Sequence, residues 1–233
     1  MTAAGRGAVS PLATYYTDPR VAHAVVRYLS STVRGGLDGR IVTEGHGGGG
    51  AFVEALLGAG ARVQVLDRDE RASALAWPGI ERSEVRSFLA PMPAEWPRPD
   101  LVVGNPPYTI RVPKAYTDPE DRDELAEARW EAVQAAASVP RKQTKPLEVA
   151  TDHVLRAIEE APVVAFVMGS GFQDGVKRYG RLHARGLLDE VLRLVPRPSF
   201  NGGGTDSAGS DLLIWRRDRD PCEPARHGWL RWR

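Results

Sequence analysis

Apolar and polar residues follow one another along the chain in patterns that predict helices and strands in turn. Between Pro19 and about Val33 the apolar residues recur with helical spacing, and Thr17 or Asp18 is placed to cap that helix. Short apolar runs bounded by Gly, Pro or Asp then indicate strands. The predicted strands cover residues 40–43, 62–66, 80–85, 101–103, 163–168, 188–195 and 211–216.

Helical patterns separate most of these strands. They cover residues 51–57, 70–77, 147–160 and 175–185. The charged strand at 80–85 suits the edge of a sheet, whereas the strand at 101–103 is apolar throughout, as a buried parallel strand should be. Strands that alternate with helices predict an α/β fold with a doubly wound, mostly parallel, seven-stranded sheet. Such a sheet binds its ligands beyond the carboxyl ends of its strands.

The alternation is interrupted once, at residues 109–145. This segment holds an acidic, helix-like stretch followed by the basic stretch 140–146, and a break of this length beside a candidate site is usually either functional or disordered. We therefore expect a single domain over residues 14–216 that carries the 109–145 insert after its fourth strand. A flexible arm at 1–13 precedes this domain, and a tail at 217–233 follows it.

Composition narrows the class of protein. With 233 residues, of which 42% are hydrophobic, the chain can bury a full core. The formal net charge of +1 excludes a globally cationic nucleic-acid coat but leaves local basic patches open. The single Cys222 excludes an internal disulfide and a cysteine-based zinc cluster. A single cysteine also fits a reducing cytosol, so we expect a cytoplasmic protein without a metal partner. No apolar stretch is long enough to span a bilayer, so we expect no membrane partner.

A glycine-rich turn, Glu44–Gly50, lies where the first strand leads into the first helix. Gly48 and Gly50 allow the backbone to approach a ligand closely. Asp67 ends the second strand, where a carboxylate can accept both hydroxyls of an adenosine ribose. Both a nicotinamide cofactor and adenosylmethionine fit this pattern. Glu44 favours adenosylmethionine, because it would repel a diphosphate but can accept from the cofactor's ammonium group.

The tetrapeptide Asn105-Pro106-Pro107-Tyr108 follows the fourth strand and is the candidate catalytic turn. The two prolines fix φ and remove two backbone donors, so the Asn105 side-chain oxygen and the Pro106 carbonyl can accept hydrogen bonds from a planar NH2 group. Tyr108 offers a ring on which the substrate can stack. This combination indicates methylation of an amine better than hydrolysis.

The order of these motifs resembles that of the amino-group DNA methyltransferases, in particular small phage-type enzymes that use S-adenosyl-L-methionine to methylate adenine N6. The resemblance is carried by residues 15–19, 44–50, 67 and 105–108, and more loosely by 198–207. It implies a Rossmann-like methyltransferase domain. It also implies that these residues bind the cofactor: Tyr16, Thr17, Glu44, Gly45, His46, Gly48, Gly50, Asp67, Arg68, Ser87, Phe88 and Asn105.

Ser87 stands where the family usually has an acidic residue, so part of the cofactor cradle departs from the family pattern. We interpret His46 as a turn residue, because one histidine without a partner makes no metal site.

The resemblance also implies DNA as the substrate. A base in a duplex has to leave the stack to reach the catalytic turn, and Tyr108 would then support it. Arg141, Lys142 and Lys145 are the candidate phosphate contacts. Basic residues at 177–185 and the C-terminal Arg226, Trp229, Arg231, Trp232 and Arg233 are further candidates. A partner protein that supplies sequence recognition stays open.

Alternatives remain at this stage. RNA adenine and a protein glutamine amide present the same planar NH2, although glutamine methyltransferases usually carry a helical domain before the fold, for which the segment before the first strand is too short. A cofactor-binding module without turnover belongs to another class, and Ser87 keeps it open. The sequence does not decide between N6-methyladenine and N4-methylcytosine as the product.

Overall fold

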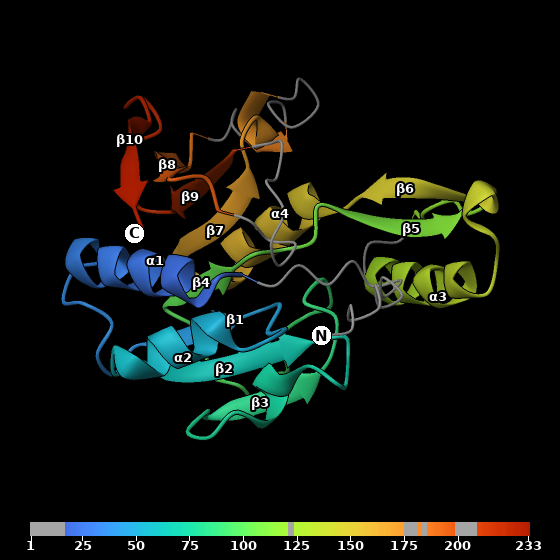
Figure 1. Cartoon of the computed structure of the whole chain (residues 1–233), viewed down its shortest axis with the longest axis horizontal. Coiled ribbons are helices and arrows are strands. Elements are labelled where there is room, and N and C mark those ends of the chain that lie inside the picture. Colours follow the sequence, from blue (N-terminus) through green and yellow to red (C-terminus); the bar gives the residue numbers. More distant parts are fainter. Residues whose placement is uncertain (1–16, 121–123, 175–180, 183–185, 199–208) are drawn as a thin grey trace, which may run out of the picture.

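The computed structural model describes residues 17–120, 124–174, 181–182, 186–198 and 209–233 (Figure 1). Its centre is an eight-stranded sheet in the order β10-β8-β9-β7-β4-β1-β2-β3. The strands are β1 (Ile41–Glu44), β2 (Arg62–Asp67), β3 (Arg82–Val85), β4 (Leu101–Gly104), β7 (Val163–Gly169), β8 (Leu188–Val195), β9 (Ser210–Arg216) and β10 (Arg226–Arg231). Only β9 runs antiparallel to its neighbours. The expected α/β fold with a mostly parallel sheet is confirmed.

Helices cover both faces of the sheet. The helices α1 (Pro19–Thr32) and α2 (Ala51–Gly58) pack on one face, and α4 (Ala150–Glu160) packs on the other (Figure 1). Successive residues of β4 point to opposite faces, as the pleat requires: Leu101 and Val103 join the core under α1 and α2, and Val102 joins the core under α4. The sheet is therefore doubly wound.

The helix α1 begins where its sequence predicts. Asp18 is the N-cap residue and accepts a hydrogen bond from the backbone N–H of Arg20 at 2.9 Å. Pro19 occupies the first turn, where its missing N–H costs nothing. Asp18 rather than Thr17 therefore caps α1, which leaves the Thr17 hydroxyl for another contact.

The expected count of seven strands is wrong by one. Residues 226–231 form β10, which pairs parallel to β8 over its whole length. The open edge of β8 offers a row of backbone donors and acceptors, and β10 satisfies them. Residues 226–231 of the expected tail at 217–233 thus continue the sheet.

Two further predictions differ from the structure. The segment 70–77 contains only the short 3-10 helix η1 (Ser73–Ala76), and Trp77 is extended because Pro78 follows it. The helix predicted at 147–160 begins only at Ala150, because residues 144–148 are a strand. The helix predicted at 175–185 and the arm at 1–13 fall outside the described residues, apart from 181–182.

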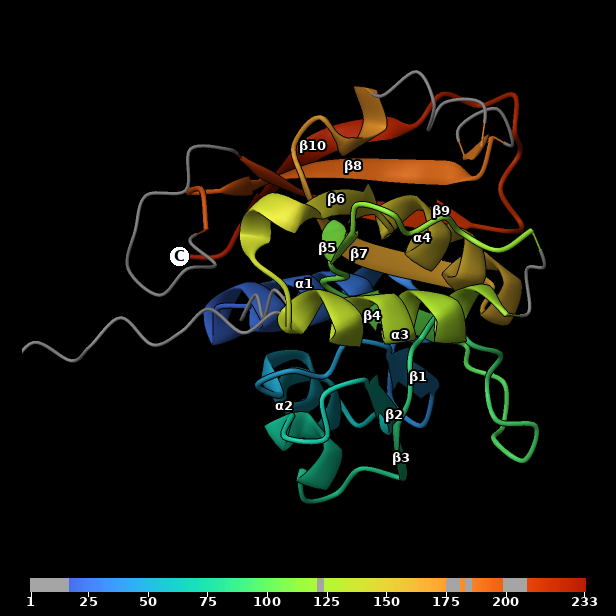
Figure 2. The same cartoon turned by 90° about the vertical axis from the view of Figure 1, so that its right-hand side faces the viewer.

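The insert after β4 has a small core of its own. The strands β5 (Thr109–Pro113) and β6 (Thr144–Glu148) pair antiparallel, and α3 (Leu125–Ala137) packs on them. The acidic stretch mostly precedes α3 rather than forming it, and the short 3-10 helix η2 (Arg141–Gln143) leads into β6. Figures 1 and 2 show the insert beyond the carboxyl ends of β1, β2 and β4. Another short 3-10 helix, η3 (Phe172–Asp174), follows β7.

Candidate active site

Asn105 lies directly after β4 and is held by the segment that precedes α1. Its side-chain Nδ2 donates to the Thr17 hydroxyl at 3.3 Å. Its Oδ1 is buried and has no hydrogen-bond partner among the described residues. A buried acceptor without a partner is costly in a folded protein, so it calls for an explanation, and a ligand that donates a hydrogen bond to it is one such explanation. The structure thus presents one free amide oxygen at the position that the sequence singled out.

The rest of the turn is fixed from both sides. Pro106 is buried, whereas Pro107 and Tyr108 are half-buried. The Tyr108 carbonyl accepts from Val149 N at 3.1 Å, which ties the turn to the beginning of α4. The Tyr108 hydroxyl donates to the Val167 carbonyl of β7 at 3.5 Å. Its side chain packs at the margin of the α4-side core, and the residue is half-buried.

Glu44 ends β1 beside this turn and is only 2% exposed. One of its oxygens accepts from His46 N at 2.9 Å. Burial raises the pKa of Glu44 to about 8, the His46 hydrogen bond opposes that rise, and the charge of Asp67 adds to it. A carboxyl group held in this way gains most from a cationic partner, because a nearby positive charge restores the ionised form.

Asp67 at the end of β2 holds the glycine turn. Its two oxygens accept from the backbone N–H groups of Gly48 and Asp69, each at 2.8 Å. Burial raises the pKa of Asp67, and these two hydrogen bonds oppose the rise. Each carboxylate oxygen has a second acceptor position, so Asp67 can still accept from hydroxyl groups.

Two glycines of the turn, Gly45 and Gly50, have no room for a side chain. A Cβ at Gly45 would lie 2.5 Å from the ring of Phe88, and a Cβ at Gly50 would lie 2.5 Å from the ring of Trp77. Gly50 also has φ of +84°, a left-handed conformation that favours glycine. Phe88 is fully buried in the α4-side core, and the Ser87 hydroxyl accepts from Leu89 N at 3.3 Å.

The interpretation of His46 as a histidine without a partner is wrong. Its Nε2 lies 2.9 Å from Nδ1 of His153 on α4, within the core that contains Phe88 and Phe166. Burial lowers the pKa of His46 to about 3 and holds the pKa of His153 well below its ordinary value. Both rings are therefore neutral near pH 7, and their hydrogen bond joins the glycine turn to α4. No pattern near His46 in the sequence points to its partner.

The insert is fastened to both halves of the site by neighbouring residues of α3. Arg129, which is 5% exposed, forms ion pairs with Asp118 at 2.8 Å and with Asp152 of α4 at 2.7 Å. The guanidinium of Arg68, which follows Asp67, lies 5.2 Å from the centre of the Trp130 ring. The insert is thus anchored to α4 and to the end of β2, contacts that the sequence analysis did not foresee.

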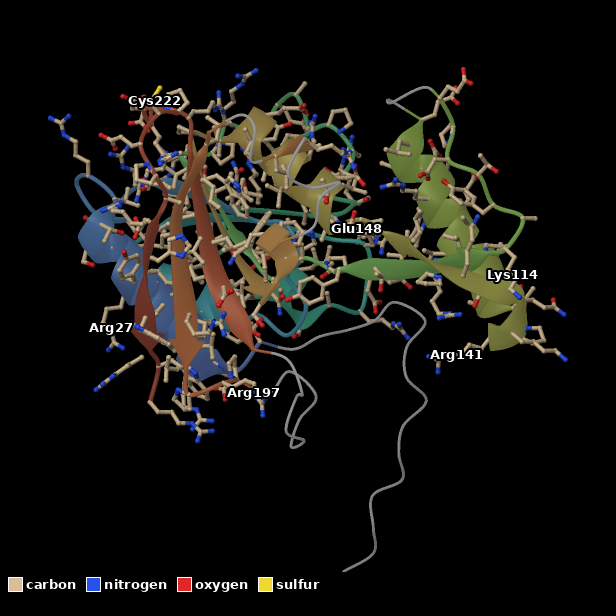
Figure 3. All side chains as sticks on the ribbon, turned by 90° about the horizontal axis from the view of Figure 1, so that it is seen from above. Arg27, Lys114, Arg141, Glu148, Arg197 and Cys222 are labelled. Atoms are coloured by element: carbon tan, nitrogen blue, oxygen red, sulfur yellow. The ribbon has the colours of Figure 1, made fainter. Side chains whose placement is uncertain are left out.

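The predicted phosphate contacts lie away from the catalytic turn. Arg141 and Lys142 are exposed on η2, and Figure 3 shows Arg141 at the far end of the insert. Lys145 is half-buried and donates to the Tyr116 carbonyl at 2.7 Å. Tyr16 and residues 199–207 of the late motif fall outside the described residues.

The described part of the chain contains no group of three or more His, Cys, Asp or Glu side chains that could hold a metal ion. None of the helices in that part is long and apolar enough to cross a membrane.

No known family model matches the chain, and no curated protein is significantly similar in sequence. Solved structures are similar. A proposed class I S-adenosylmethionine-dependent methyltransferase from Listeria monocytogenes superposes with a TM-score of 0.62 at 11% identity, over 97% of this chain and 68% of that one. The chain has the class I methyltransferase fold.

Two further neighbours share this methyltransferase fold. A proposed RNA methyltransferase from Pyrococcus horikoshii superposes with a TM-score of 0.58 at 15% identity, over 91% of both chains. A type I restriction-modification methyltransferase subunit from Streptococcus thermophilus superposes with a TM-score of 0.60 at 16% identity, over 88% of this chain and 44% of that subunit. The chain thus spans less than half of that subunit. In a doubly wound fold the carboxyl edge of the strands is the ligand-binding edge, and Glu44, Asp67 and Asn105 all lie there.

Proposed function

We propose that this protein is an S-adenosylmethionine-dependent methyltransferase that methylates N6 of adenine in DNA. The observation that carries the proposal is the buried, unpartnered Oδ1 of Asn105 at the carboxyl end of β4. It is the acceptor that a planar NH2 group requires. It stands in a turn whose two prolines remove competing backbone donors.

The residues present fit the cofactor. Adenosylmethionine supplies a methyl group bonded to a sulfonium, together with an ammonium group and a ribose. Glu44 is a buried carboxyl without a cationic partner among the described residues, and it suits the ammonium group. Asp67 keeps acceptor positions for the ribose hydroxyls. Asp67 also holds the glycine turn in place, so the cradle is formed before the cofactor binds.

The role of the catalytic turn is to change the geometry of the amine nitrogen. The lone pair of adenine N6 is delocalised into the ring, which makes the nitrogen a weak nucleophile. When the Asn105 oxygen and the Pro106 carbonyl accept hydrogen bonds from its two N–H groups, the nitrogen becomes more tetrahedral and its lone pair points to the methyl donor. The new N–C bond would form as the C–S bond of the sulfonium breaks, and the methylated amine would then lose its extra proton to solvent. These hydrogen bonds are strongest in the transition state, so they lower the barrier rather than only tightening binding.

The surroundings of Asn105 set a condition for entry of the base. Because Oδ1 is buried, a base that reaches it has to displace the atoms that cover it. The ring of the half-buried Tyr108 is the candidate stacking surface for the flipped base. The bond from Asn105 to Thr17 keeps the amide oriented with its oxygen free.

DNA is favoured by the order of the sequence motifs and by the fold shared with the restriction-modification subunit. RNA is the second candidate, because the Pyrococcus horikoshii neighbour covers almost the whole chain in both directions. The test is transfer of labelled methyl from adenosylmethionine to duplex DNA, single-stranded DNA, RNA and protein, followed by nucleoside or amino-acid analysis. Label in N6-methyladenine of DNA is expected. Label in N4-methylcytosine, in RNA or in glutamine would show that the substrate is a different one from adenine in DNA. Cofactor binding without any transfer would indicate a non-catalytic module.

A further inference from the structure

The strand β10 lies at one edge of the sheet and carries a conspicuously exposed aromatic residue. Trp229 is 75% exposed, and among the described large apolar side chains only Val85 on the opposite edge strand is also markedly exposed. An indole with this exposure on an edge strand invites uncontrolled association unless something covers it.

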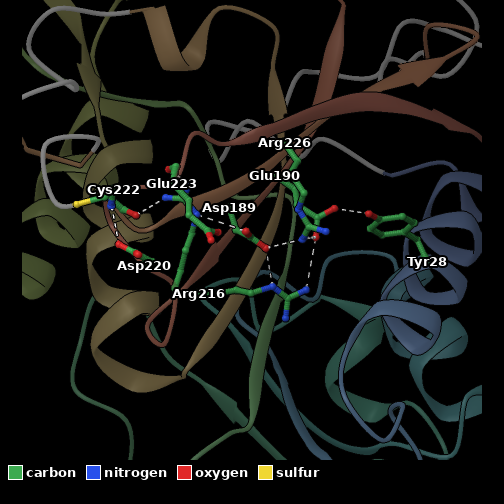
Figure 4. Close-up of polar contacts among 10 residues, drawn as sticks. Tyr28, Asp189, Glu190, Arg216, Asp220, Cys222, Glu223 and Arg226 are labelled. Atoms are coloured by element: carbon green, nitrogen blue, oxygen red, sulfur yellow. Dashed lines mark hydrogen bonds and ion pairs between the residues drawn. The ribbon is translucent and has the colours of Figure 1, made fainter.

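The structure separates the C-terminal aromatic and basic residues into two groups. The Trp232 ring is buried and its N–H donates to the Pro196 carbonyl. Arg226 pairs with Asp189 and Glu190, and Figure 4 shows it directed towards that buried acidic pair. These residues hold β10 against β8 and are structural.

The second group faces away from α1. His227, Trp229 and Arg231 alternate along β10 and are all exposed, whereas Leu230 between them packs against the α1-side core. The alternation places these three side chains on one face of the strand. Nothing in the packing of the described residues requires a tryptophan at position 229.

The indole lies beside two arginines. Trp229 is directly opposite Arg193 in the β10–β8 register, so the two side chains share a face. Arg193 pairs with the buried Asp211, yet 45% of its side chain stays exposed. Arg231 is exposed two positions along β10, on the same face. An exposed ring flanked by cations is complementary to a nucleic-acid strand, whose bases stack on aromatic rings while its phosphates contact arginine.

The position of this surface relates it to the candidate active site. Both β8 and β10 run parallel to β4, and Arg193, Trp229 and Arg231 lie in the carboxyl-terminal halves of their strands. Four strand spacings separate β10 from β4 in the sheet, on the order of 20 Å before the twist is counted. That span corresponds to about six nucleotides at a rise of ~3.4 Å.

We propose that Trp229, Arg193 and Arg231 form a nucleic-acid-binding surface, on which an unpaired base stacks on Trp229 while the arginines contact its phosphates. The strand bound there is continuous with the one that presents its amine to Asn105. In naming the substrate class, this inference rests on the proposed function. The site itself lies away from the catalytic turn and is measurable without turnover.

The test measures binding of the full-length protein to a fluorescently labelled single-stranded 20-nucleotide DNA, and to an RNA of the same sequence, by fluorescence anisotropy. Trp229→Ala should weaken binding by about 5- to 150-fold, the range for loss of one base–aromatic stack, and Trp229→Phe should recover most of the affinity. Arg231→Ala should lower the slope of log affinity against log salt by about 0.7. Matched controls come from the opposite edge strand β3, where exposed Val85→Ala and Arg82→Ala should change neither quantity.

Two results would overturn the inference. One is an affinity for both oligonucleotides that Trp229→Ala leaves unchanged. The other is self-association of the native protein that Trp229→Ala abolishes without changing oligonucleotide binding, which would make the surface a protein interface. Oligonucleotide binding that depends on Trp229, without methyl transfer to any substrate, would uphold the surface and reject the proposed activity. Methyl transfer to DNA, combined with oligonucleotide binding that Trp229→Ala does not change, would uphold the proposed activity and reject the binding surface.

Discussion

The carboxyl group of Glu44 lies against the backbone of Gly104, at the ends of two neighbouring strands. A Cβ at Gly104 would be 2.5 Å from Oε1 of Glu44 and 3.2 Å from its carboxyl carbon. Gly104 directly precedes Asn105, so this contact joins the glycine turn to the catalytic turn. The absence of a side chain at position 104 is what allows Glu44 to occupy its buried position.

Gly104→Ala is expected to weaken adenosylmethionine binding by at least about tenfold. The added Cβ would displace the Glu44 carboxylate, and loss of its hydrogen bond to the cofactor's ammonium group would cost roughly 1.5–3 kcal/mol. Isothermal titration calorimetry measures this loss. The matched control is Gly58→Ala at the end of α2, where a Cβ meets no atom within 4 Å. Native cofactor affinity in the Gly104→Ala protein would show that Glu44 is not a cofactor ligand.

The raised pKa of Glu44 makes stability depend on pH in a defined direction. Its pKa is about 8 in the folded protein because of burial, compared with an ordinary 4.5. The folded state therefore holds a proton that the unfolded state has lost, and this contribution is complete below pH 4.5 and disappears as the pH rises through 8. Glu44→Gln should flatten the fall in melting temperature between about pH 5 and pH 9. Parallel melting curves for the native and variant proteins would argue against a buried, protonated Glu44.

Arg129 is expected to be the main electrostatic anchor of the insert. Arg129→Ala leaves Asp118 and Asp152 without this shared partner and should cost about 3 kcal/mol, as is usual when one member of a buried ion pair is removed. Urea unfolding gives the value. The exposed pair of Arg62 and Glu81 provides the control, and Arg62→Ala should cost less than about 1 kcal/mol. Equal losses for the two variants would contradict the anchoring role.

The buried histidine pair should destabilise the protein in acid. Burial lowers the pKa of both His46 and His153, so below about pH 6.5 the unfolded chain binds protons that the folded chain rejects. Stability from this pair is complete above that pH and is lost as the pH falls. His153→Gln removes one titrating ring and should reduce the loss between pH 6.5 and pH 4. Acid unfolding that His153→Gln leaves unchanged would count against this account.

Local patterns of apolar and turn residues were sufficient to predict most strands of the sheet. The strands β1, β2, β4, β7, β8 and β9 are short apolar runs with turn residues at their ends, and each lies within two residues of its prediction. The strand β10 was missed because its polar and aromatic residues form an edge strand only when β8 is beside it. The pair β5 and β6 was missed because β6 contains Pro146 and its partner lies on the other side of α3.

In the candidate site, too, some residues could be predicted from the sequence and others could not. Glu44, Asp67 and Asn105 stand at strand ends, so their position follows from the strand pattern and parallel topology. His153 and Arg129 act through partners distant in the chain, 107 residues away for His46 and 23 for Asp152. No sequence spacing identifies such pairs, because packing of α4 and α3 against the sheet brings them together.

The central claim is that the Asn105 oxygen accepts from the amine that receives the methyl group. Its most direct test compares Asn105→Ala with the native protein, measuring labelled methyl transfer to duplex DNA and, by calorimetry, adenosylmethionine affinity. The account predicts a fall in turnover of at least about 100-fold, the usual cost of removing one transition-state hydrogen bond, with cofactor affinity changed by less than about threefold. Transfer at the native rate by the Asn105→Ala protein would contradict it.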